Sequence, residues 1–148
     1  TTAEENLSLG SQDTKAPGVL LSSTGLIDAV AAEAGVAIDE KLGIIKVKAV
    51  GLQGSSEGVK GLQTSLASGQ GVGPIYINAE GRPDSAESAT SSYGVAYWVN
   101  VPPGTKNLSF KTNLTCSQAG GAWDGSSAGI FDIPVEAGAT TLTTVVCQ

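Results

Sequence analysis

Short segments in which apolar and polar residues alternate recur along the chain. In residues 44–50 the alternation places three apolar side chains on one face and Lys46 and Lys48 on the other, which is the spacing of a half-buried β-strand. The same reasoning predicts further strands at 62–66, 74–78, 85–90, 95–100, 106–111, 130–136 and 140–147. About eight short strands separated by turns predict an all-β fold, a sandwich or barrel, in place of a parallel α/β sheet.

The residues before these strands follow a different pattern. Apolar residues recur at near-helical spacing after Thr24 and stop at Gly35, which predicts one short helix over about 24–35. Residues 1–23 are mostly polar, and we interpret them as an extended N-terminal arm ahead of a sandwich domain at 24–148. Three apolar residues of the arm, Val19, Leu20 and Leu21, follow a Pro-Gly breaker and are suited to pairing with a sheet edge. The alternative is a loosely ordered terminus.

Composition narrows the class of protein. The 148 residues suit one domain, and with 5% aromatic residues the core must consist largely of Val, Ile, Leu and Ala. Charged residues make up only 15% of the chain, a low share that exported proteins and assembly subunits often have. The net charge is −6 and no group of Lys and Arg converges, so we expect no binding to nucleic acid or anionic membranes. No apolar run is long enough to span a bilayer.

The two cysteines, Cys116 and Cys147, lie 31 positions apart and form no CxxC motif. We predict a disulfide, which would stabilise the fold by roughly 3–4 kcal/mol and close a C-terminal extension at about 113–148. The alternative is a pair of buried thiols in a reducing cell. The chain begins Thr1-Thr2-Ala3 without methionine, which suits removal of a signal peptide. Together these features predict a secreted or cell-surface protein.

The chain contains no histidine. This excludes Ser-His and Cys-His nucleophiles and imidazole-based metal sites, so we expect a protein that is not an enzyme and needs no cofactor. Carboxylates that could serve a glycosidase are present, at Glu80, Asp84, Glu87, Asp124 and Asp132. Oxygen ligands for calcium alternate between Asn78 and Asp84, but we favour the interpretation in which these side chains bond the backbone of a turn.

Two further groups of residues are candidates for contact with other molecules. Three Asn-X-Ser/Thr sequons begin at Asn6, Asn107 and Asn113; they allow glycosylation in a secretory route, and they also arise by chance in a Ser/Thr-rich chain. The candidate binding aromatics are Trp98, Trp123 and Tyr93.

The two tryptophans have alternative structural roles. In residues 95–100, Tyr97 and Trp98 fall on opposite faces, so one aromatic points away from the core unless both faces are covered. We slightly favour Trp98 packing under the arm or the helix. For Trp123 in a glycine-rich loop, a binding role and a loop anchor are evenly matched.

One stretch of the chain resembles a known family. Residues 89–105 read ATSSYGVAYWVNVPPGT, in which Gly94 permits a tight turn and Pro102-Pro103-Gly104 forces another. This pattern is similar to carboxypeptidase regulatory-like domains, the transthyretin-like modules of exported bacterial proteins, and with residues 34–50 the resemblance extends over about 35–110. It implies an antiparallel two-sheet β-sandwich of transthyretin type. It implies no catalysis, because such modules are usually non-catalytic appendages.

Two hypotheses of function follow. In the first, the protein is an extracellular structural subunit that assembles with itself, as in a filament, through addition of the arm to a neighbouring sandwich. In the second, it is a monomeric module that binds a glycan or a protein through its exposed aromatic residues. We prefer the first, because the sequence does not group aromatic and polar residues into a recognisable pocket.

Overall fold

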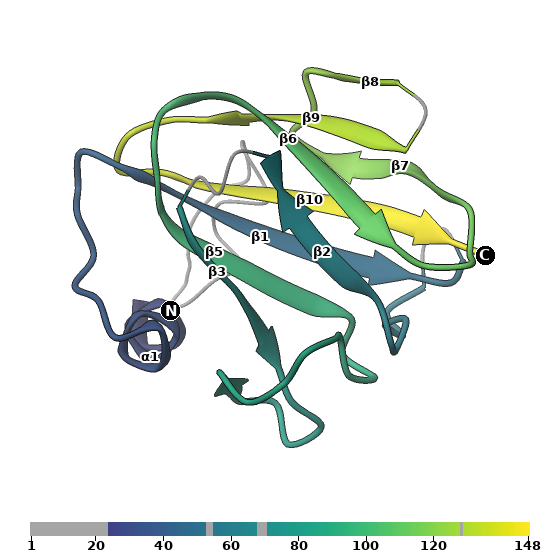
Figure 1. Cartoon of the computed structure of the whole chain (residues 1–148), viewed down its shortest axis with the longest axis horizontal. Helices are drawn as coiled ribbons and strands as arrows, with labels where there is room; N and C mark the ends of the chain where they lie inside the picture. The colour runs from purple at the N-terminus through teal and green to yellow at the C-terminus, as the bar shows by residue number, and fades with distance from the viewer. Residues whose placement is uncertain (1–23, 53–54, 68–70, 128) are drawn as a thin grey trace, which may run out of the picture.

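The computed structural model describes residues 24–52, 55–67, 71–127 and 129–148. These residues form one helix and ten strands, arranged as a six-stranded sheet on a four-stranded sheet (Figure 1). The helix packs on the outer face of the larger sheet. The prediction of an all-β, two-sheet sandwich with one short helix is therefore confirmed.

Helix α1 spans Thr24–Ala34. Gly35 follows it with φ of +75°, the left-handed conformation that glycine adopts without a steric penalty. The N–H of Gly35 donates to the carbonyl of Ala32, and the N–H of Val36 donates to the carbonyl of Ala31. These two bonds form a Schellman motif, which satisfies the last carbonyls of the helix. The helix therefore ends immediately before Gly35, the glycine from which its end was predicted.

The larger sheet has the strand order β4-β3-β5-β1-β10-β7. Its members are β1 (Gly43–Val50), β3 (Val72–Ile77), β4 (Pro83–Asp84), β5 (Val95–Val101), β7 (Cys116–Gly121) and β10 (Thr140–Cys147). All neighbours are antiparallel except β1 and β10, which run parallel and side by side (Figure 1). A parallel pair requires a long crossover, which the chain between residues 51 and 139 supplies.

The smaller sheet is antiparallel throughout, with the order β2-β6-β9-β8. Its strands are β2 (Gln63–Leu66), β6 (Gly104–Lys111), β8 (Gly125–Ser127) and β9 (Ile130–Val135). Among the described residues, strand β2 has a neighbour on one side only, because β6 is its single partner in the sheet. The four-stranded sheet therefore ends in an edge at β2.

The two faces of β5 are buried in different environments. Trp98, 2% exposed, lies in the core between the sheets with Ile45, Leu108 and Ile133. Tyr97, fully buried, lies on the opposite face in the cluster that includes the helix residue Val30. Both faces are therefore covered, one by the second sheet and one by α1. Trp98 is buried, as favoured from the sequence, but the second sheet covers it and the residue under the helix is Tyr97; the arm lies outside the described residues.

The predicted strands match the observed ones closely, with one error and three omissions. Residues 85–90 do not form a strand; β4 ends at Asp84, and the carboxylate of Asp84 accepts the N–H of Ala86 in a turn. Polar side chains that bond the local backbone compete with strand formation in this way. Strands β4, β7 and β8 were not predicted. Strand β4 has only two residues, Pro83 and Asp84, which are typical of turns. In β7 and β8, Ser, Gly and Gln predominate and apolar residues do not alternate.

The predicted disulfide between Cys116 and Cys147 is present, with an S–S distance of 2.05 Å. Cys147 lies directly opposite Cys116 in the β10–β7 pair. Strand β10 lies between β1 and β7, and the disulfide links it covalently to β7, on the side away from β1. Among the described residues, the structure contains no helix long and apolar enough to cross a membrane.

Candidate assembly site at the open side of the sandwich

The two long sides of the sandwich differ, and the side formed by β7 and β8 is closed. Residues 122–124 carry the chain from one sheet to the other, with the N–H of Ala122 donating to Leu142 and that of Asp124 donating to Asp132. The side chain of Gln118 also bridges the sheets, since its amide donates to the carbonyl of Gly125 at 2.8 Å. Main-chain and side-chain bonds therefore seal this side.

Trp123 belongs to the same closure. Its indole N–H donates to the carbonyl of Gly120 at 2.9 Å, and its ring centroid lies 5.6 Å from that of Phe131. The residue is half-buried against the core. These contacts anchor the loop, and a binding role for the exposed part of Trp123 stays a prediction.

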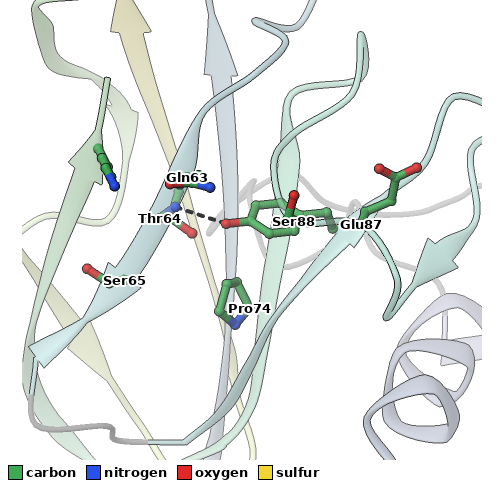
Figure 2. A pocket seen from close by; sticks show the side chains of 8 residues that line it. Gln63, Thr64, Ser65, Pro74, Glu87 and Ser88 are labelled. Carbon is green, nitrogen blue, oxygen red and sulfur yellow. Dashed lines mark hydrogen bonds between the residues drawn. The ribbon is translucent and has the colours of Figure 1, made fainter. Parts of the chain in front are cut away.

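The opposite side of the sandwich, where β2 faces β3, is hollowed into a groove of about 430 Å³ (Figure 2). Its lining comes from both sheets and from the segment after β4, and consists of Gln63, Thr64, Ser65, Pro74, Tyr76, Glu87, Ser88 and Lys111. We call this the β2–β3 groove. It is shallow, and its surface mixes polar and apolar groups.

One hydrogen bond crosses the β2–β3 groove. The backbone N–H of Thr64 donates to the hydroxyl of Tyr76 at 3.0 Å, drawn as the dashed line in Figure 2. Both residues are buried. The hydroxyl oxygen of Thr64 is also buried and has no partner among the described residues. A buried polar atom without a partner is costly, so the groove contains a point at which hydrogen bonding is incomplete.

This bond also shows which way the backbone of β2 faces. In an antiparallel ladder the N–H and C=O of one residue point to the same side, and Thr64 points its N–H away from β6. Two residues earlier, Leu62 exchanges bonds with Thr90 on that side. By the same alternation, the backbone groups of Thr64 and Leu66 are directed toward the open side. Because the Leu62 groups and the Thr64 N–H are already bonded on this side, the part of the ladder edge that a further strand would pair with is the Thr64 carbonyl and the backbone groups of Leu66.

The facing edge, β3, is protected. It contains Pro74, which has no N–H to donate. Its far end is covered by the two-residue strand β4, with Tyr76 opposite Asp84 and Ile77 opposite Pro83. Short edge strands and proline are the devices by which native sheets resist addition of further strands. Strand β2 is also short, but it contains no proline, and among the described residues no further strand pairs with its open side.

A second groove, of about 520 Å³, adjoins the first at the end of β2. The two grooves share Gln63 and Lys111, and the second also includes Lys60 and the turn residue Leu114. Leu114 is 41% exposed. The two grooves together therefore extend along β2 and past its N-terminal end.

The remaining candidate aromatic, Tyr93, lies away from these grooves. It is 45% exposed, and its backbone carbonyl accepts a hydrogen bond from the Lys48 ammonium at 2.7 Å. Trp98 is buried in the core and Trp123 is a loop anchor, so the structure does not bring the three candidate aromatics together on one surface. Trp98 offers no exposed face for stacking.

The oxygen-rich segment around Asn78 and Asp84 forms a hydrogen-bonded turn. The side-chain oxygen of Asn78 accepts the N–H groups of Glu80 and Arg82, each at 3.0 Å. Its amide donates to Asp84 at 3.3 Å. These oxygens bond the turn backbone, as favoured from the sequence. Across the described residues, the structure contains no group of three or more His, Cys, Asp or Glu placed to hold a metal ion.

Two lysines on β1 have lowered pKa values. Burial lowers the pKa of Lys46, whose ammonium lies 5.7 Å from the centre of the Tyr97 ring. Burial, and then the charge of Lys46, lowers the pKa of Lys48. Both effects disfavour the charged form. The pair lies on the outer face of the larger sheet, away from the grooves, and takes no part in the candidate site.

The arm residues Val19, Leu20 and Leu21 lie outside the described residues, so their placement stays a prediction. Sequence reasoning did not identify Thr64, Tyr76 or Pro74 as site residues. Thr64 and Tyr76 lie 12 positions apart and in different sheets, and no local pattern signals such a contact.

Comparison with known proteins gives no family. No model of a known protein family matches the chain, and no curated protein matches its sequence.

Proposed function

We propose that this chain is a non-enzymatic extracellular structural protein that assembles with itself, as a filament subunit does, by strand addition. The arm of one copy pairs with the free edge of β2 in the next copy and occupies the β2–β3 groove. The observation that carries the proposal is the difference between the two sides of the sandwich: one is sealed by Gln118 and the 122–124 crossing. The other ends, among the described residues, in the edge strand β2 beside a groove.

The arm has the features that such a donor needs. In an extended strand Val19 and Leu21 share a face, and they match the face on which β2 buries Thr64 and Leu66. Burying those two arm side chains contributes about 3–6 kcal/mol. Association itself costs at least about 4 kcal/mol, so main-chain bonds along β2 are needed as well. The proposed contact therefore depends on both the apolar residues and the ladder.

Binding of a glycan by a monomer has less support. That hypothesis relied on exposed aromatic rings, and of the three candidates Trp98 is buried and Trp123 is half-buried against Phe131. Tyr93 remains exposed but lies apart from both grooves. We therefore place self-assembly first.

Two further properties belong to the same proposal. The disulfide supports export, because such bonds persist in oxidising compartments. The signature at 91–105 and the two-sheet architecture support membership of the carboxypeptidase regulatory-like family, whose modules are usually non-catalytic.

The test compares the solution mass, by light scattering, and the negative-stain images of three proteins. These are the full chain, a variant with Val19→Lys and Leu21→Lys, and a matched control with Leu7→Lys and Leu9→Lys. The control changes the same number of arm residues by the same charge. We expect polymers from the full chain and the control, and monomers from the Val19/Leu21 variant. Equal assembly of all three would remove Val19 and Leu21 from the mechanism, and a monomeric full chain would refute self-assembly.

A further inference from the structure

The structure describes two of the three sequons, and they lie in different settings. Asn113, Leu114 and Thr115 form most of the turn between β6 and β7, and all three residues are exposed. Sequons that accept a glycan are characteristic of surface loops in secreted proteins. The acceptor side chain, the middle residue and the hydroxyl residue of this sequon are all open to a modifying enzyme.

The sequon at Asn107 is incorporated into the sheet. Its side-chain amide donates to Asp132 at 2.6 Å. Its middle residue, Leu108, is fully buried between the sheets. The hydroxyl of Ser109 lies 2.9 Å from that of Ser65, in a hydrogen bond in which either can donate. Each of the three residues is therefore already engaged by the fold.

The turn that carries Asn113 is firmly supported at its base. The N–H of Leu114 donates to the hydroxyl of Thr112 at 3.1 Å. Thr115 exchanges two backbone hydrogen bonds with Gln148, and the next residue is the disulfide-bonded Cys116. The exposed sequon is therefore anchored at its end by backbone hydrogen bonds and by the adjacent disulfide. Disulfides of this kind form in the oxidising compartments of exported proteins.

We propose that Asn113 is an N-glycosylation site, modified on the folded protein, and that Asn107 is not. The donor is an oligosaccharide linked through phosphate to a lipid, and the transferase is supplied by the cell. The amide nitrogen of Asn113 bonds to the anomeric carbon of the first sugar. The bond between that carbon and the phosphate oxygen breaks, the lipid phosphate leaves with the electron pair, and a base of the transferase takes the amide proton.

Trypsin separates the two sequons into different peptides. Cleavage after Lys106 and Lys111 releases residues 107–111, which contain Asn107, and residues 112–148, which contain Asn113 and no further Lys or Arg. Mass spectrometry of the reduced digest of the protein from its native source therefore reads each site independently. We expect the mass of peptide 112–148 to be raised by the mass of a glycan, and peptide 107–111 to have its unmodified mass.

Variants produced in the same cells identify the acceptor. Asn113→Gln removes the acceptor nitrogen of the sequon, and Thr115→Ala keeps the asparagine but removes the hydroxyl. Both should abolish the increment on peptide 112–148. Thr115→Ser and the control Asn107→Gln should retain it. An unmodified peptide 112–148 in the native protein would overturn the proposal, as would equal modification of peptide 107–111. Neither result depends on whether the protein polymerises.

Discussion

Replacing Tyr76 by phenylalanine removes one oxygen atom from the open side of the sandwich and leaves the ring in the core. The lost atom is the acceptor of the Thr64 N–H, and Thr64 is only 6% exposed. A buried donor that loses its partner costs about 1–3 kcal/mol. We therefore expect Tyr76→Phe to lower the free energy of unfolding by that amount.

Urea denaturation of the full chain, followed by tryptophan fluorescence, measures the effect. With a slope of about 1.5 kcal/mol per molar urea, the midpoint should fall by about 0.7–2 M. The matched control is Tyr93→Phe, which removes the same atom from a residue that is 45% exposed. An exposed site of this kind should change stability by no more than about 0.5 kcal/mol.

Two results would contradict the reasoning. If Tyr76→Phe also stays within about 0.5 kcal/mol of the parent, water satisfies the Thr64 N–H and the groove is wetter than its geometry indicates. If both substitutions lower the free energy of unfolding equally, the decrease comes from removing a tyrosine hydroxyl in general, and the hydrogen bond across the groove contributes nothing specific.

Three other predictions test the fold. Replacing Cys116 and Cys147 together by alanine should lower the free energy of unfolding by about 3–4 kcal/mol in urea titrations, from the entropy of the opened loop. Gly94→Ala places a Cβ against the backbone carbonyl oxygen of Ala49 at φ of +68° and should cost at least about 2–3 kcal/mol. Gly61→Ala, which has open space at φ of +86°, should cost about 1–2 kcal/mol. Because burial lowers the pKa of Lys46 below its usual 10.5, the unfolded chain binds more protons just below that pH and stability rises across this window. Thermal melts should show that Lys46→Met reduces the rise and leaves the part due to Lys48, whose pKa burial also lowers.

The strands that the sequence predicted best lie at the centre of the sheets. Strand β10 was predicted at its observed bounds, and β1 and β5 to within a residue or two. Each contains several β-branched or aromatic residues, and each is packed on both faces or fills the core. For such segments local propensity and burial favour the same conformation.

The prediction failed where pairing depends on distant parts of the chain. Strand β7 contains mostly small and polar residues, and it is placed by its register with β10 and by the disulfide. The surroundings of Trp98 could not be predicted for a related reason. Alternation shows that Tyr97 and Trp98 face opposite ways, but it does not show which face meets the second sheet and which meets α1.

The candidate site follows from strand order, which no local pattern encodes. Strand β2 becomes an edge because β6, β9 and β8 all lie on its other side. The groove beside it depends on β3 ending up opposite, in the other sheet. The sequence predicted a segment suited to strand addition at residues 19–21, but the edge that we propose as its acceptor became visible only in the assembled sandwich.

If the arm of one copy fills the groove of the next, the two contacting surfaces are different. Such a head-to-tail interface continues indefinitely unless its rotation closes a ring. The donor precedes Thr24 and the acceptor is the β2 edge, so each chain carries one of each. The average mass should then rise continuously with protein concentration. A single species of twice the subunit mass would instead indicate reciprocal exchange between two copies, which uses the same edge but leaves no free end for growth.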